Sequence, residues 1–125
     1  MSLSHLLAAV AVVGAVLTPA AHAQRATNLH ARTAGELADL CAASPRGGLG
    51  DAQVNYCHGF AQGAVDVMLH DAGEKKPFCF PSPVPTRTET LGQFVRWVRA
   101  DSSHASLPAA GGLHQFLTER YPCNR

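Results

Sequence analysis

Apolar residues recur every three to four positions in several stretches of this chain, which is the spacing of helices that bury one face. The first stretch follows Thr33 and Glu36, whose spacing matches a capping box in which each side chain bonds a free backbone N–H. Leu37 and Leu40 come next at helical spacing. We therefore predict a short helix over residues 34–43.

The longest apolar pattern predicts a helix over residues 52–72, with Asp51 as its N-cap and Gly73 just beyond its end. Gly59 and Gly63 lie four residues apart in it, and their lack of side chains allows another backbone to approach closely. Two neighbouring apolar faces cover most of the circumference. The remaining polar strip is narrow and consists of Asn55, Gln62 and Asp66. A helix this apolar is typical of the centre of a domain, so we expect it to be the central one.

Residues 74–85 contain four prolines and cannot form a helix, because proline lacks the backbone N–H that a helix interior needs. We expect a stiff, extended loop there. Thr86 and Glu89 repeat the capping-box signature. The apolar positions that follow predict a third helix over residues 88–101.

Pro108 suits the first position of a fourth helix, and Tyr121-Pro122 ends its apolar pattern. No stretch of the chain shows a sustained alternation of apolar and polar residues, which is the signature of a strand. The predicted fold is therefore all-α, a small four-helix domain.

The chain begins with a pattern typical of a secretory signal. Residues 6–17 form an apolar run of 12 residues, and residues 21–23 give the small-x-small motif that signal peptidase cleaves. This run is too short to span a bilayer, which needs about 20 apolar residues. We expect cleavage after Ala23, export to the periplasm, a loose leader over 24–32 and a domain over 33–125. No cysteine lies near the cleavage site, so no lipid anchor is expected.

The charge of the chain is balanced, with 10 Lys and Arg residues against 9 Asp and Glu residues. A nucleic-acid-binding protein needs a clustered basic face to contact phosphates. The balance argues against that class and gives no sign of binding to a membrane surface.

The four cysteines all follow the signal, and their number is even. In an oxidising compartment this indicates two disulfides. In an up-down order of helices, the end of the first helix lies beside the start of the second, and the second and fourth helices end at the opposite pole. This order favours pairs Cys41–Cys57 and Cys79–Cys123, although the sequence leaves the other two connectivities open.

No constellation typical of catalysis or metal binding is found in the sequence. There is no Cys-x-x-Cys motif, and no two histidines after residue 23 have the spacing of a metal pair on a helix. Cys57 and His58 are adjacent, but adjacent residues on a helix point about 100° apart. We therefore expect a binding protein without catalytic residues, cofactor or metal, rather than an enzyme.

Asp66 is the only acidic residue between Asp51 and Asp71 on the longest predicted helix. Two interpretations remain open for it. In the first, it lies with Gln62 on the solvent-facing strip. In the second, it is a partly buried structural acceptor that fixes a neighbouring helix or a partner.

Phe78 and Phe80 flank Cys79 in the proline-rich loop. Both either fold inward over the ends of the helices or are presented to a partner by the loop. A loop that is stiffened by prolines and anchored by a disulfide loses little entropy on binding, which favours recognition. If the chain binds a protein, we expect Phe78 and Phe80, with Arg87 at the end of the loop, to be its main contacts.

Several segments together resemble the Rap/Tai family, which are periplasmic immunity proteins associated with type VI secretion. The resemblance rests on TAGELADLC at 33–41, YCHGFAQGAVDVM at 56–68, PFCFP at 77–81 and RYPC at 120–123. It covers nearly the whole predicted domain. The chain departs from the family in its Gly111-Gly112 pair and its longer proline-rich loop.

The resemblance implies an all-helical protein, often a homodimer, that binds and blocks a peptidoglycan amidase effector. It carries over no catalytic residue, and only the four cysteines and the segment around Asp66 match by position. Two other functions stay open, a periplasmic acid-stress chaperone and a small cell-wall enzyme. An unassigned periplasmic binding protein is the remaining alternative.

Overall fold

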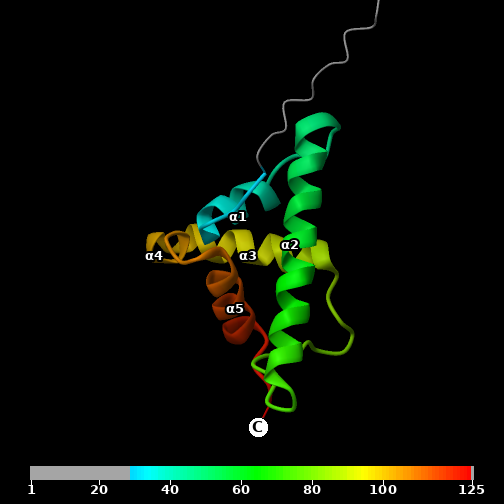
Figure 1. Cartoon of the computed structure of the whole chain (residues 1–125), viewed down its shortest axis with the longest axis vertical. Helices are drawn as coiled ribbons and strands as arrows, with labels where there is room; N and C mark the ends of the chain where they lie inside the picture. The colour runs from blue at the N-terminus through cyan, green and yellow to red at the C-terminus, as the bar shows by residue number, and fades with distance from the viewer. Residues whose placement is uncertain (1–28, 125) are drawn as a thin grey trace, which may run out of the picture.

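A computed structural model describes residues 29–124 of the chain, and every regular element in that range is a helix (Figure 1). The expected signal over 1–23, its cleavage site and most of the leader lie outside the described residues. None of the described helices combines the length and the apolar character needed to cross a membrane. The helices are α1 (Ala34–Cys41), α2 (Gly48–Ala72), α3 (Arg87–Ala100), α4 (Ser102–Ala105) and α5 (Ala109–Arg120).

The two capping boxes expected from the sequence are both present. The Glu36 backbone N–H donates to Thr33 Oγ1 at 3.1 Å, and the Glu89 backbone N–H donates to Thr86 Oγ1 at 3.2 Å. Each glutamate carboxylate accepts a backbone N–H in return. A hydrogen bond from the Arg32 backbone lowers the pKa of Glu36, and the Thr86 hydroxyl lowers the pKa of Glu89. Local sequence therefore fixes where α1 and α3 begin.

The start of α2 differs from the expectation. The helix begins at Gly48, four residues before the expected start, and Asp51 lies inside its first turn rather than at its N-cap. Gly47 and Gly48 have φ values of +86° and +60°, which favour glycine. These two glycines make the turn into the helix, so no side-chain cap is needed at this point.

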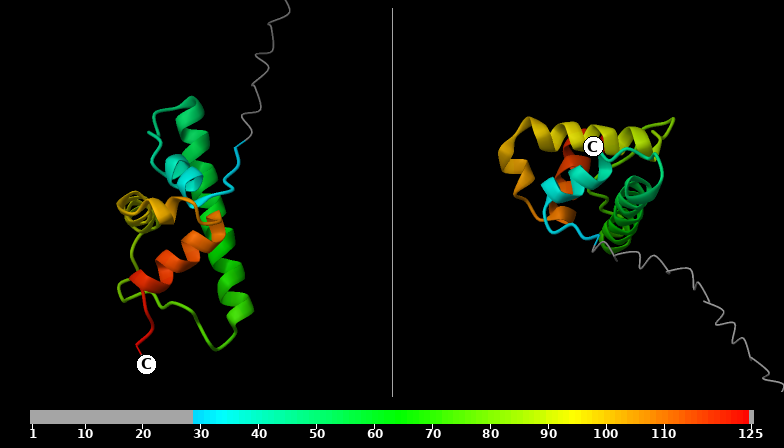
Figure 2. Two further views of the ribbon diagram at one scale, coloured as in Figure 1. Left: turned by 90° about the vertical axis from the view of Figure 1, so that its left-hand side faces the viewer. Right: turned by 90° about the horizontal axis from the view of Figure 1, so that it is seen from above.

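The expectation that the longest helix is central is wrong. The short helix α1 packs against α2, α3, α4 and α5, whereas α2 packs mainly on α1 and α5. Figures 1 and 2 show α2 along one side of the molecule, with α3 running across it. Only Cys57 and Ala61 of α2 are fully buried, and Val67 is 59% exposed. Because α3 crosses α2 instead of lying along it, much of the apolar surface of α2 stays uncovered.

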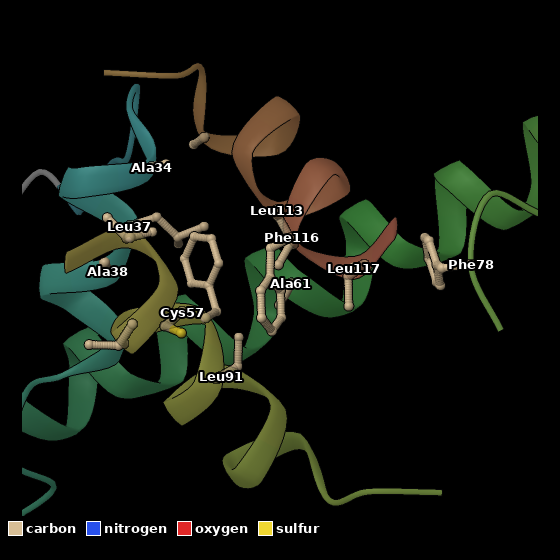
Figure 3. Packing of buried hydrophobic residues seen from close by; sticks show 14 of the residues in the cluster. Ala34, Leu37, Ala38, Cys57, Ala61, Phe78, Leu91, Leu113, Phe116 and Leu117 are labelled. Atoms are coloured by element: carbon tan, nitrogen blue, oxygen red, sulfur yellow. The ribbon is translucent and has the colours of Figure 1, made fainter. Parts of the chain in front are cut away.

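Residues from α1, α2, α3 and α5 converge on one core (Figure 3). Helix α5 approaches α1 closely at Gly112, where an added Cβ would lie 2.6 Å from Ala34 Cβ. By contrast, Gly59 and Gly63 have no neighbouring atom within 4 Å of an added Cβ. Of these three glycines, only Gly112 therefore marks a close approach of two helices, and the expectation for Gly59 and Gly63 is wrong.

Besides the four expected helices, the fold contains the one-turn helix α4. Asp101 starts it by accepting the Ser103 backbone N–H at 2.8 Å. The two disulfides join Cys41 to Cys57 and Cys79 to Cys123, which is the favoured pairing. The first joins the end of α1 to the middle of α2, and the second ties the proline-rich loop to the segment after α5.

Candidate partner-binding groove

A groove of about 330 Å³ opens between α2, the proline-rich loop, α3 and α5. Its floor is apolar, and Leu91, Leu113 and Leu117 on that floor are buried. Val84, on the loop, is 69% exposed at its edge. The other lining residues are Ala61, Gln62, Val65, Phe80, Pro85, Arg87 and Thr90. Segments far apart in the sequence therefore build one concave surface.

Phe80 is held in place from several directions. Its ring packs against Phe78 at 5.7 Å and against Tyr121 at 5.2 Å between ring centroids. The preceding residue, Cys79, donates its backbone N–H to the Tyr121 carbonyl at 2.8 Å and is joined to Cys123. The half-buried Phe80 ring is therefore preorganised at the groove wall, which limits the entropy it would lose on binding a partner.

Phe78 has a different environment from Phe80. Its side chain is 1% exposed and belongs to the hydrophobic core. Phe78 does not line the groove, so its position gives no support to the expectation that it is a partner contact. Phe78 instead contacts the Phe80 ring from within the hydrophobic core.

Arg87 is exposed at the first position of α3 and lines the same groove as Phe80. It is the only charged residue among those that line the groove. Within the described chain, no carboxylate forms an ion pair with it. The nearby Glu89 carboxylate accepts bonds from the Thr86 backbone and hydroxyl. The groove thus has an apolar floor and one available positive charge at its edge.

Asp66 lies outside the groove on the exposed strip of α2. It accepts a hydrogen bond from Gln62 Nε2 at 2.9 Å, one helical turn away. Of the two interpretations that the sequence left open, this placement matches the solvent-facing strip.

A second, more polar cleft lies between the outer faces of α3 and α5 and has a volume of about 550 Å³. At its centre, Trp97 Nε1 donates to Glu119 Oε2 at 2.8 Å, and His104 stacks on the Trp97 ring. Hydrogen bonds from Gln115 and then Trp97 lower the pKa of Glu119. Gln93 in this cleft also accepts a hydrogen bond from Arg120, whereas Arg96 forms no ion pair with a described carboxylate.

The sequence pointed to Phe80 and Arg87 but missed most of the groove, including Val65, Val84 and Leu117. These residues carry no chemical signal, since apolar residues at helical spacing look the same whether they face the core or a groove. In the described residues, no group of three or more His, Cys, Asp or Glu side chains is placed to hold a metal ion.

Comparison with known proteins gives one match. A sequence model of the family described as Rap1a immunity proteins matches residues 33–123. The match begins at the N-cap of α1 and ends at the last cysteine, so it includes all the described helices. No curated protein and no solved structure gives a significant match to the chain.

Proposed function

Because the chain belongs to the Rap1a immunity protein family, we propose that it binds and inhibits a peptidoglycan amidase delivered by type VI secretion. The observation that carries this proposal is the match of the family over the whole helical domain. An immunity protein acts by binding its effector, so it requires a recognition surface and no catalytic residues. The partner is then a protein, namely the cognate amidase.

The proposal places this binding in the periplasm, where an amidase would meet the cell wall. The N-terminal sequence has the pattern of a cleaved secretory signal. Two disulfides join all four cysteines, and such bonds persist in oxidising compartments. Both features support export of the protein across the inner membrane.

The groove supports the proposal as the recognition surface. It combines a fixed aromatic ring, Phe80, with an arginine, Arg87, and both residue types are enriched among the side chains that dominate binding energy. Exposed Val84 extends the apolar surface onto the loop. We propose that the effector contacts this groove and its edge.

The test is titration calorimetry of the purified protein against the amidase encoded nearest its gene, with cell-wall hydrolysis measured in parallel. An antidote must act on few toxin molecules, so we expect nanomolar affinity or better, about −12 kcal/mol. Inhibition should be complete near an equal molar ratio. No heat and no inhibition with any neighbouring amidase would refute the proposed function.

Variants locate the surface. Phe80→Ala should weaken binding by about 2 kcal/mol or more, as for other binding hot spots, and circular dichroism of the variant checks that the domain stays folded. Asp39→Ala on α1 is the matched control, because Asp39 is exposed and lies outside the groove. Tight binding that Phe80→Ala leaves unchanged would keep the function but place the contact surface elsewhere.

A homodimer belongs to the same proposal. Helix α2 carries two exposed apolar side chains, Leu49 at 50% and Val67 at 59%, which a second copy would shield from water. Sedimentation velocity of the purified protein measures its mass in solution. If the protein is a monomer at every concentration up to the one it reaches in the periplasm, the proposed dimer is refuted. The proposed inhibition of the amidase would not be affected by that result.

A further inference from the structure

We propose that the groove receives an apolar side chain of the partner together with a neighbouring carboxylate, which pairs with Arg87. This inference rests on the proposed function and adds the chemistry of the partner segment. It commits to an apolar–acidic element of the effector as the occupant. Three properties of the groove support this occupant: its apolar floor, its small volume and the single charged residue at its edge.

The floor selects an apolar group. Leu91, Leu113 and Leu117 are buried beneath it, while Val65 and Phe80 form half-buried walls. The floor residues offer no hydrogen-bond partner to replace the bonds that a polar group would lose to water, which disfavours a polar group against the floor. The one nearby hydroxyl, Thr90 Oγ1, lies 3.4 Å from the Tyr121 hydroxyl and is already paired.

The size of the groove limits how much of a partner can enter. Its volume of about 330 Å³ lies at the lower end of the range of about 300–1,000 Å³ for ligand pockets. A whole helix or strand does not fit in this volume, but one large side chain does. The rest of the partner segment would then lie across the edge formed by Val84 and Arg87.

The charge at the edge selects the second group. Arg87 is the only charged lining residue, and no described carboxylate pairs with it. The guanidinium group bonds a carboxylate through two parallel N–H donors. Its position at the first turn of α3 adds the positive end of the helix dipole, which also favours an anion. An acidic residue of the partner, next to the apolar side chain that enters the groove, would interact favourably with the Arg87 guanidinium and with the helix dipole.

The test uses two small probes that mimic this pair of groups and do not require the effector. The purified protein, with methyl groups labelled, is titrated by NMR with 4-phenylbutyrate and with its neutral counterpart 4-phenylbutan-1-ol. We expect saturating shifts of the Val65, Leu113 and Leu117 methyl groups with the acid. The alcohol should bind several-fold more weakly, because it cannot pair with Arg87.

The matched variants are Arg87→Gln and Arg96→Gln. Both remove an exposed arginine of α3, but Arg96 lines the second cleft and not the groove. Arg87→Gln should weaken binding of 4-phenylbutyrate to the level of the alcohol, and Arg96→Gln should not. In the amidase assay, Arg87→Gln should lower affinity by about tenfold or more, which corresponds to 1.4 kcal/mol.

Three results would overturn the inference. The first is equal binding of the acid and the alcohol. The second is the absence of any shift of the Val65, Leu113 and Leu117 methyl groups when the acid is added. The third is a shift of the groove methyl groups with protein concentration alone, which would make a second copy the occupant.

The inference and the proposed function can fail separately. An amidase that Arg87→Gln inhibits as well as the parent does would overturn the inference and leave the function intact. Binding of 4-phenylbutyrate as expected, with no neighbouring amidase bound, would support the chemistry of the groove and refute the function.

Discussion

The close approach of α5 to α1 at Gly112 predicts a large difference between two adjacent glycines. An alanine Cβ at position 112 would lie 2.6 Å from Ala34 Cβ, and Ala34 is fully buried. Carbon atoms pack best at about 3.5–4.0 Å, so the two helices would have to separate by about 1 Å. Neither Cβ can move by changing rotamer, since each is fixed to its backbone.

Overpacking of this kind costs typically about 1–3 kcal/mol. Replacing a helical glycine by alanine without strain stabilises the folded protein by about 0.4–1 kcal/mol. We therefore expect Gly112→Ala to lower the free energy of unfolding by about 1–2 kcal/mol, or the Tm by about 5–15 °C for a domain of this size. The shift would also displace Leu113 and Leu117, which form part of the groove floor.

Gly111→Ala is the internal control. Its Cβ would lie 3.8 Å from Pro108 Cβ, an ordinary contact, so only the gain in helix stability remains. We expect this variant to be as stable as the parent or up to about 1 kcal/mol more stable. Urea unfolding of both variants measures the difference. Equal stability of Gly112→Ala and Gly111→Ala would refute the close packing of α1 on α5.

Three further predictions concern export, the polar strip and acid. Intact mass spectrometry of the protein from the periplasm should find Gln24 at its N-terminus, and a retained N-terminal methionine would contradict export. Asp66→Asn should change the free energy of unfolding by less than about 0.5 kcal/mol, because Asp66 is exposed and bonded only by Gln62. A decrease in the free energy of unfolding of more than about 1 kcal/mol would instead indicate that Asp66 is a structural acceptor. The pKa values of Glu36 and Glu89 are lowered from 4.5, so the stability that their ionised forms contribute should be present above pH 4.5 and lost as pH falls below it. Glutamine at both positions should flatten this loss in thermal melts, and an unchanged acid profile would contradict the role of the capping boxes.

Features that depend on neighbours in the sequence were predictable. Thr33 with Glu36 and Thr86 with Glu89 fixed the starts of two helices, because the capping bonds span only three residues. Four prolines in residues 74–85 ruled out a helix, because each proline lacks the backbone N–H that a helix needs, whatever its neighbours are. The disulfide pairing that the helix order favoured is the one observed, although the sequence left two other connectivities open and Cys57 lies farther into its helix than expected.

The position of α2 was not predictable in the same way. Its apolar circumference indicates that much of the helix avoids water, but it does not say whether the chain itself or a partner provides the cover. The short α1 became the centre because Ala34 and Ala38 are small enough to let its neighbours approach from several sides. Small residues give a weak hydrophobic signal, so periodicity assigned the central place to the longer and more apolar helix.

The uncovered part of α2 and the groove have one physical origin. Helix α3 crosses α2 steeply (Figures 1 and 2), so the two helices cannot close along their length, and Val65 is left facing the space between them. The proline-rich loop borders this space, and the Cys79–Cys123 disulfide holds the loop against the end of α5. A loop without that anchor would be free to cover the part of Val65 that stays exposed. Anchoring the loop at its far side therefore holds it away from Val65, and under the proposed function the effector would cover the apolar surface that stays open.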